Sequence, residues 1–162
     1  REVHPKARSF RSHCFYSDSR MTSYFYEQGF RYDSNLCLYL TRKCLPFVHN
    51  SGLISFPVFW EDDIHWTWED HFQFKNSKLE KELLGPGLKI FNIHPLNIAL
   101  NIPSNDYYLK YKSCNILESY EEAKRFLYKG HGVRSFVNET IEFILKNDLK
   151  CYYLDEVYHM LF

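Results

Sequence analysis

The sequence predicts an α/β fold with mostly parallel strands. β-prone segments alternate with helical segments along the chain, which is the pattern of strand–helix–strand units. The 162 residues, 45% of them hydrophobic, suffice for one ordinary domain with a core of its own. Glycine and proline are scarce, at six residues each, and fall where elements end. We therefore expect residues 1–162 to form a single domain.

The first sixty residues are expected to contain short strands and one helix. Gly29 follows the helical segment as a natural C-cap, and Pro57 places the strand around it at a sheet edge or strand end. The expected elements are an extended segment at 7–16, a helix at 19–28, a strand at 30–34, a loop at 36–50 and a strand at 52–60.

The rest of the chain is expected to be mainly helical around one good strand. Ser119 and Glu122 have the spacing of a capping box, which indicates a helix start. The expected elements are a partly helical stretch at 64–84, a strand at 88–93, helices at 106–112, 120–128 and 133–146, a strand at 151–153 and a helix from 155. The helix at 133–146 carries an apolar stripe of Val133, Phe136, Val137, Ile141, Ile144 and Leu145.

Charge and cysteine content narrow the class of protein. Twenty basic and 20 acidic residues give no net charge, which excludes the electrostatic footprint of a nucleic-acid or membrane-surface binder. No apolar run reaches the ~20 residues of a membrane span, and no signal peptide is visible. The five cysteines are odd in number and irregularly spaced, so we expect buried, reduced thiols in a cytoplasmic protein. The oligomeric state is left open.

Aromatic side chains are abundant, at 19% of the residues. A general composition bias, which also favours Lys, Ile and Asn, explains this aromatic content. A binding site whose rings stack on flat ligands or sugar faces explains it equally well. The second interpretation concentrates on Phe59 and Trp60, because they directly precede an acidic trio. We expect these two rings, with Glu61, to contact substrate.

Three polar clusters stand at candidate strand ends, where side chains of parallel strands gather at one mouth. Each cluster also has an interpretation without function. Arg11 and His13 would lie on an exposed edge strand, the acidic trio 61–63 would form a solvated turn, and His94 would merely cap a strand. His49, His65, His71 and His131 are expected at the surface or in loops. The clusters are Arg11 with His13, the trio Glu61, Asp62 and Asp63, and His94.

Several catalytic classes lack their motifs. The sequence contains no G-x-S-x-G elbow, no G-x-G-x-x-G and no phosphate-binding G-x-x-x-x-G-K-[ST]. Nucleophilic serine hydrolases, dinucleotide enzymes and kinases are therefore disfavoured, and no cysteine has the local signature of a nucleophile.

Taken together, the clusters resemble the polysaccharide deacetylase (NodB-homology, carbohydrate esterase) superfamily, in its WbmS-like surface-polysaccharide branch. The resemblance covers nearly the whole chain and rests on the order and spacing of several segments. These segments are 4–13, 26–35, 59–63, 89–101, 136–145 and 148–156.

The resemblance implies a distorted (β/α)7 barrel that binds a divalent metal, most often zinc, to polarise an N-acyl carbonyl and activate water. It implies that Arg11 tunes a catalytic carboxylate and that Asp62 or Asp63, with Trp60, lines the site and pairs with that arginine. His94 matches the histidine that protonates the leaving amine. His13 is a candidate metal ligand.

Two motifs of the superfamily are absent. Its Thr-Phe-Asp-Asp-like strand end and its ligating histidine motif have no counterpart in the sequence, and a complete barrel typically needs ~250 residues. We therefore expect an N-terminally incomplete C-terminal portion of the barrel, with most metal ligands upstream of Arg1.

The leading hypothesis is a metal-dependent deacetylase of N-acylated sugars in polysaccharide biosynthesis or modification. The alternative is a non-catalytic carbohydrate-binding or degenerate protein on the same fold. A weaker third possibility is a metal site that serves another reaction on sugars. The leading hypothesis requires His94 to lie within about 10 Å of Asp62 or Asp63, which is the reach of a hydrogen bond and one water.

Overall fold

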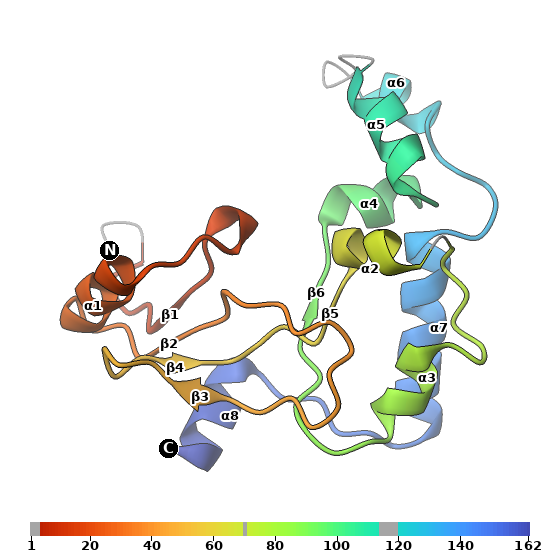
Figure 1. Ribbon diagram of the computed structural model, residues 1–162. Helices are drawn as coiled ribbons and strands as arrows, with labels where there is room; N and C mark the ends of the chain where they lie inside the picture. Colours follow the sequence, from red (N-terminus) through yellow and green to blue (C-terminus); the bar gives the residue numbers. More distant parts are fainter. Residues whose placement is uncertain (1–3, 70, 114–119) are drawn as a thin grey trace. The chain divides into compact units, whose positions relative to one another are not determined.

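The computed structural model describes residues 4–69, 71–113 and 120–162, and the chain divides into two compact units (Figure 1). The first unit comprises residues 1–59, 86–91 and 151–162. The second comprises residues 60–85 and 92–150. Each unit is therefore built from segments that are distant in the sequence.

The first unit contains a four-stranded sheet with the order β1-β2-β4-β3. β1 and β2 pair in parallel, as do β2 and β4, whereas β3 pairs with β4 antiparallel. This confirms the α/β class with mostly parallel strands, and the described strands do not form a closed barrel. The strands are β1 (Ser9–Phe10), β2 (Tyr32–Asp33), β3 (Phe47–Val48) and β4 (Ile54–Ser55).

Helix α1 (Ser19–Glu27) follows local signals. Asp18 is its N-cap and accepts a hydrogen bond from the Met21 amide at 2.8 Å. Gly29, at φ 86°, takes the left-handed conformation after the helix that glycine tolerates best.

The segment before α1 differs from the prediction. β1 ends at Phe10, and His13–Phe15 form a short 3₁₀ turn, η1, in which Cys14 has a left-handed φ of 53°. The extended segment expected at 7–16 would place Arg11 and His13 on one face of a strand, and this expectation is wrong, because they are not alternate residues of one strand.

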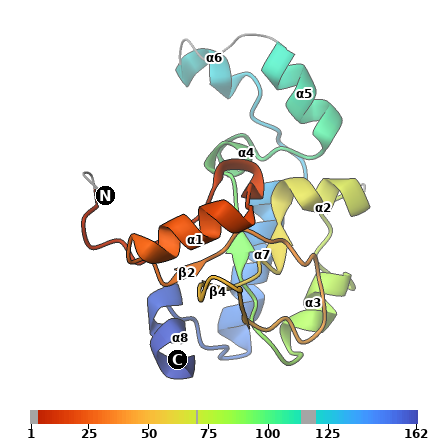
Figure 2. The ribbon, with the colours of Figure 1, turned by 60° about the vertical axis from the view of Figure 1, so that its left-hand side comes forward.

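The core of the first unit lies between the sheet and the C-terminal helix α8 (Leu154–Leu161) (Figure 2). Tyr32 stacks on Tyr158 with ring centroids 5.1 Å apart and donates its hydroxyl to Asp155 Oδ1 at 3.0 Å. The strand predicted at 151–153 is absent, because Tyr153 is the N-cap of α8 and its backbone amide donates to Glu156.

A two-stranded sheet pairs β5 (Trp60–Glu61) with β6 (Phe91–Asn92). The second unit is otherwise helical. Helix α4 was not predicted: Pro95 at its first turn supplies the fixed φ that suits a helix start. Ser119 of the predicted capping box lies outside the described residues. The helices are α2 (Asp62–Trp68), α3 (Lys78–Leu83), α4 (Pro95–Leu100), α5 (Asn105–Ser113), α6 (Tyr120–Lys124) and α7 (Val133–Lys146).

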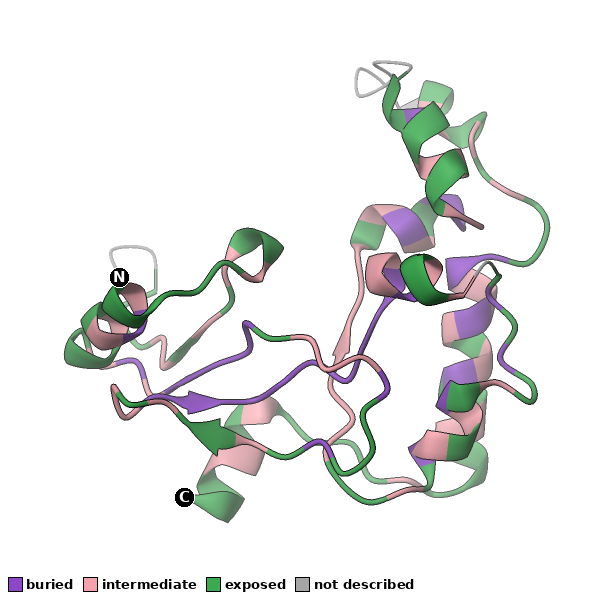
Figure 3. Cartoon of the chain, in the orientation of Figure 1, coloured by how far each residue is buried: buried purple, intermediate pink, exposed green. Residues whose placement is uncertain are grey.

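Helix α7 has the predicted bounds but turns a different face inward (Figure 3). Val133 and Phe136 are buried as expected, together with Thr140, whereas Ile141 and Leu145 are exposed. The predicted stripe thus included two exposed residues and omitted Thr140. Thr140 is compatible with the core because its hydroxyl donates to the Phe136 carbonyl at 2.8 Å.

Aromatic rings fill the centre of the second unit. Trp60 stacks on Phe136 with centroids 5.3 Å apart and an interplanar angle of 19°. His65 lies in the same cluster at 3% exposure, with its centroid 4.8 Å from that of Phe72. The expectation that His65 is a surface residue is therefore wrong.

His65 is held as a neutral ring. Its Nδ1 accepts from Trp60 Nε1 at 3.2 Å, and its Nε2 faces the His71 carbonyl at 3.1 Å, which makes Nε2 the protonated nitrogen. Burial lowers the pKa of His65 to about 4. A second proton would also replace the Trp60 hydrogen bond by a donor–donor contact.

Two further expectations concern the burial of the cysteines and the presence of membrane-spanning helices. Cys44 is buried, but Cys14 and Cys151 are exposed, so the prediction of uniformly buried thiols is wrong. Cys37 is half-buried, and Cys114 lies outside the described residues. Within the described stretches, no helix has the length and apolarity needed to cross a membrane.

We predict that Phe136→Ala lowers the free energy of unfolding by about 3–5 kcal/mol, because it removes the ring on which Trp60 stacks. Leu145→Ala on the same helix is the matched control, since Leu145 is 72% exposed. The control should change stability by less than about 0.5 kcal/mol. Denaturant unfolding of both variants measures the difference, and equal effects would contradict the assignment of the inward face of α7.

We predict that acid destabilises the protein through His65. The unfolded chain takes up a proton near pH 6.5, whereas the folded state resists it down to about pH 4, so stability is full above pH 6.5 and falls as the pH drops through this window. The loss between pH 7 and 5 should be about 2 kcal/mol. His65→Asn keeps an acceptor for Trp60 and should flatten this dependence, while the exposed His4→Ala should leave it unchanged.

Candidate active site

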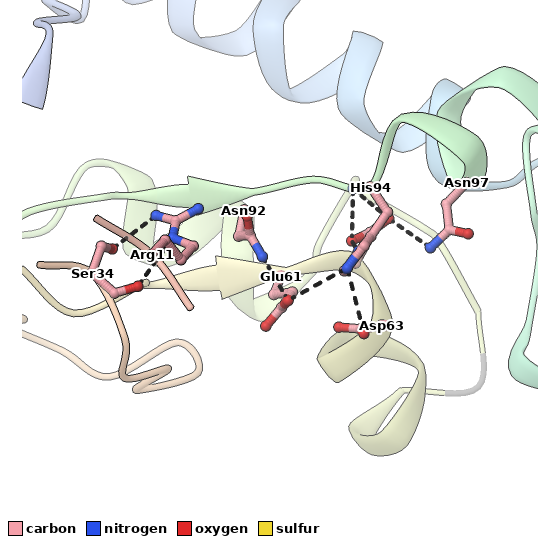
Figure 4. Close-up of polar contacts among 8 residues, drawn as sticks. Arg11, Ser34, Glu61, Asp63, Asn92, His94 and Asn97 are labelled. Atoms are coloured by element: carbon pink, nitrogen blue, oxygen red, sulfur yellow. Dashed lines mark hydrogen bonds and ion pairs between the residues drawn. The ribbon is translucent and has the colours of Figure 1, made fainter. Parts of the chain in front are cut away.

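A hydrogen bond between Asp62 and His94 lies at the centre of the polar cluster, in which His94 also faces Glu61 and Asp63 (Figure 4). Asp62 opens α2 directly after β5, and His94 is the N-cap of α4, two residues after the end of β6. The distance from His94 Nδ1 to Asp62 Oδ1 is 2.7 Å. Paired strands thus bring together two residues that lie 32 positions apart in the sequence.

Asp62 is completely buried and surrounded by donors. Asn97 Nδ2 donates to Oδ2 at 2.9 Å, and the His94 backbone amide reaches both carboxylate oxygens at 3.2 and 3.3 Å. Burial raises the pKa of Asp62, and the hydrogen bonds from His94 and Asn97 oppose that rise. These bonds satisfy the carboxylate that folding removes from water.

The other ring nitrogen of His94 faces two further carboxylates. His94 Nε2 lies 4.0 Å from Glu61 Oε1 and 3.9 Å from Asp63 Oδ2. One potential ligand atom from each of these three residues can be chosen so that all lie within 4.8 Å of one another. Asn92 Nδ2 donates to Glu61 Oε1 at 2.6 Å.

The acids and the histidine shift one another's proton affinity. Burial, followed by the charge of Asp63, raises the pKa of Glu61 to about 7. Burial alone would lower the pKa of His94, but its hydrogen bond to Asp62 and the charges of the three carboxylates outweigh this and raise it. The site therefore favours the protonated form of a half-exposed imidazole next to Glu61 and Asp62, whose pKa values are raised.

This arrangement suits proton transfer. Asp62 fixes the proton on Nδ1 and orients the ring, which leaves Nε2 to act on a bound molecule. The His94 side chain is 43% exposed, so a ligand can reach Nε2.

Comparison with protein families matches residues 1–112 to the WbmS-like polysaccharide deacetylases. This chain belongs to the WbmS-like polysaccharide deacetylase family. The match includes every residue that the sequence singles out as a site candidate. A search of curated proteins gives no match.

A solved structure shares the fold of this family member. It is WbmS of Bordetella bronchiseptica, described as a polysaccharide deacetylase involved in O-antigen biosynthesis, with a TM-score of 0.72 and 21% identity. The alignment covers 87% of this chain and 57% of the Bordetella chain. The present sequence therefore spans little more than half of that protein, and at this identity the likeness concerns the fold alone.

Four of the predicted site residues of this deacetylase-family chain come together. Glu61, Asp62, Asp63 and His94 share one cluster, well within the distance that the leading hypothesis requires. The prediction that polar residues at strand ends lie close together is correct for these residues, because β5 and β6 are paired and the residues that follow them are in contact.

Arg11 and His13 belong to the first unit. The Arg11 guanidinium donates to the Ser34 carbonyl at 3.0 Å and to the Ser34 hydroxyl at 2.8 Å. The pairing of Arg11 with an active-site acid stays a prediction. His13 is exposed, and among the described residues it is not a member of a group of three ligand-type side chains.

Phe59 and Trp60 do not serve the predicted stacking role. Both rings are fully buried, so neither presents a face to a sugar. Phe59 carries the Lys89 ammonium 4.7 Å from its ring centroid, and Trp60 stacks on Phe136. The prediction failed because an aromatic residue before a polar strand end points as readily into the core as into a pocket.

Two asparagines of the site were not predicted. Asn92 contacts Glu61, and Asn97 contacts Asp62. Asn97 could have been found, since it lies three residues after His94 at the start of a helix opened by Pro95 and so shares the face of His94. Asn92 precedes His94 by two residues in a strand and so faces the same side.

We predict that Asn97→Ala destabilises the fold by about 1–3 kcal/mol, because it removes a donor from the fully buried Asp62 carboxylate. The matched control is Asn138→Ala at an exposed position of α7, which should be nearly neutral. Urea unfolding at pH 7 tests the pair. Equal stability of the two variants would show that Asp62 does not depend on this donor.

Proposed function

We propose that this chain supplies the proton-donating histidine of a metal-dependent deacetylase that hydrolyses N-acylated sugars in polysaccharide biosynthesis or modification. The hydrogen bond between Asp62 and His94, with Nε2 accessible, is the observation that carries the proposal. Membership of the WbmS-like polysaccharide deacetylase family supports the class of reaction. The Bordetella protein is described as involved in O-antigen biosynthesis, which supports a carbohydrate substrate.

The chemistry of amide hydrolysis explains why such a histidine is needed. Water adds to the acyl carbon, and the tetrahedral intermediate releases an amine only if the departing nitrogen receives a proton. The imidazolium of His94 donates that proton from Nε2, while Asp62 holds the ring through Nδ1 and stabilises its positive charge. Asp62 is thus a positioning residue, and His94 is the catalytic acid.

The neighbouring acids favour the charged form of His94 before reaction. Glu61 and Asp63 lie about one water molecule's reach from Nε2, at 4.0 and 3.9 Å. The hydrogen bond and charge of Asp62, followed by the charges of Asp63 and Glu61, raise the pKa of His94 and so favour the protonated ring that can donate. Asp63 can also contact polar groups of the substrate, because its side chain is 41% exposed, whereas Glu61 is buried like the rings of Phe59 and Trp60.

Metal dependence is part of this proposal by family resemblance. When bound, a divalent ion, zinc first, would polarise the N-acyl carbonyl and lower the pKa of the attacking water. The predicted ligand His13 has no described ligand set around it, so no step of the mechanism is assigned through that residue. Two further parts of the proposal rest on the same resemblance. Arg11 tunes an active-site carboxylate, and the complete protein forms a distorted (β/α)7 barrel.

We predict that His94→Asn in the full-length protein lowers kcat for acetate release from an N-acetylated sugar by about 10²-fold or more, because general-acid catalysis is lost. Asp62→Asn should lower kcat by a similar order with little change in KM, since it disturbs the ring of His94 and not substrate binding.

His4→Asn is the matched control for the activity assay, because His4 is an exposed histidine outside the cluster. It should leave kcat and KM unchanged. Full activity of His94→Asn would contradict the proposal. Stoichiometric sugar binding without acetate release by the wild-type protein would instead support a non-catalytic carbohydrate-binding protein.

A further inference from the structure

We propose that Glu61, Asp63 and His94 bind a divalent cation such as Zn²⁺ or Mn²⁺, and that this cation removes His94 from proton transfer. The family resemblance assigns no metal to these three residues: it places the metal ligands in other motifs and gives His94 the role of acid. The cation would therefore be a second ion with an inhibitory effect.

The positions of the donor atoms are the first observation that supports the cation site. One carboxylate oxygen from Glu61, one from Asp63 and His94 Nε2 lie within 4.8 Å of one another. A zinc ion bonds such atoms at ~2.0–2.2 Å, so small side-chain rotations bring all three into its reach. Two carboxylates and one imidazole are also a donor set that Zn²⁺ and Mn²⁺ accept.

Two buried oxygen atoms without hydrogen-bond partners among the described residues are the second observation that supports the cation site. Glu61 is 4% exposed, and its Oε2 has no hydrogen-bond partner among the described residues. Asp63 Oδ1 is likewise buried without a partner in that part of the chain. Two facing carboxylates are both acceptors, so they cannot bond to each other unless a proton or a cation lies between them.

The surrounding contacts prepare the site for a cation. Asp62 holds the proton of His94 on Nδ1, which directs the lone pair of the neutral ring from Nε2 toward Glu61 and Asp63. Asn92 orients the Glu61 carboxylate through Oε1. Outer hydrogen bonds of this kind fix the ligands of metal sites and raise their basicity. Asp63 and His94 are both over two-fifths exposed, which leaves a path for entry.

A shared proton is the competing occupant. Burial and the charge of Asp63 raise the pKa of Glu61 to about 7, so at neutral pH a proton can occupy the gap between the two carboxylates. Cation binding would displace this proton and the one on His94 Nε2 to solvent. The two occupants therefore exclude each other, and a binding experiment distinguishes them.

Inhibition follows from the ligand role of His94 and rests on the proposed function. A cation that takes the Nε2 lone pair leaves no proton there for the departing amine. Excess divalent metal should therefore slow deacetylation beyond the first equivalent, although the ion supplies no new chemistry at the carbonyl.

The binding experiment uses the 162-residue chain and titrates Co²⁺ by absorption and Zn²⁺ by calorimetry, after metal is removed with a chelator. The expected result is one site that Asp63→Asn and Glu61→Gln each weaken at least 10-fold. Asp106→Asn, an exposed acid at the start of α5, is the matched control and should bind as the wild type does. Thermal unfolding without metal confirms that the variants are folded.

A second readout does not depend on variants. Mn²⁺ should broaden the ring proton signals of His94 selectively in NMR spectra. The cation site is overturned if no ion binds, if binding is unchanged in Asp63→Asn and Glu61→Gln, or if another histidine is broadened in place of His94.

The inhibition arm separates this inference from the proposed function. In the full-length deacetylase, added Zn²⁺ should inhibit the wild type, and Asp63→Asn should need at least 10-fold more Zn²⁺ for the same fractional inhibition. If the ion binds but no deacetylation is detected, the proposed function fails while the site stands. If deacetylation occurs but excess Zn²⁺ has no effect, the inhibitory role is overturned and the proposed function stands.

Discussion

The hydrogen bond from His94 to the buried carboxylate of Asp62 is the contact on which the site depends. A carboxylate without donors is costly to bury, so the fold must bring donors to Asp62. Those donors are the ring and amide of His94 and the side chain of Asn97, which lie at the other strand end and on the next helix. The requirement to satisfy one carboxylate thus fixes where two strand–helix junctions meet.

The same contact determines the chemistry open to His94. With Nδ1 committed to Asp62, only Nε2 faces the half-exposed side of the cluster, where Glu61 and Asp63 concentrate negative charge. That charge attracts either a proton or a cation. The proposed proton donation to an amine and the proposed inhibition by a second metal ion therefore depend on one electrostatic arrangement.

The aromatic excess of the sequence serves the core more than the site. Trp60, which the sequence places next to the acids, stacks on Phe136 and donates to the neutral ring of His65. This packing sets the strand end from which Glu61 and Asp62 continue. Aromatic residues thus form the core beside the site, and the exposed side chains of the cluster are the polar Asp63 and His94.

The α/β class and the identity of the acids and the histidine follow from local patterns in the sequence: apolar runs, helix signals at Gly29 and along 133–146, and polar residues directly after strands. The family follows from the order and spacing of the segments that resemble it. The sequence did not determine which face of α7 is buried, that Trp60 points inward, or that His65 is a core residue. Each depends on neighbours distant in the chain. The spacing of Asn92 and Asn97 from His94 places them on its side, but their partners Glu61 and Asp62 emerge only from the tertiary structure, because these acids lie 31 and 35 positions away and become neighbours only when the strands pair.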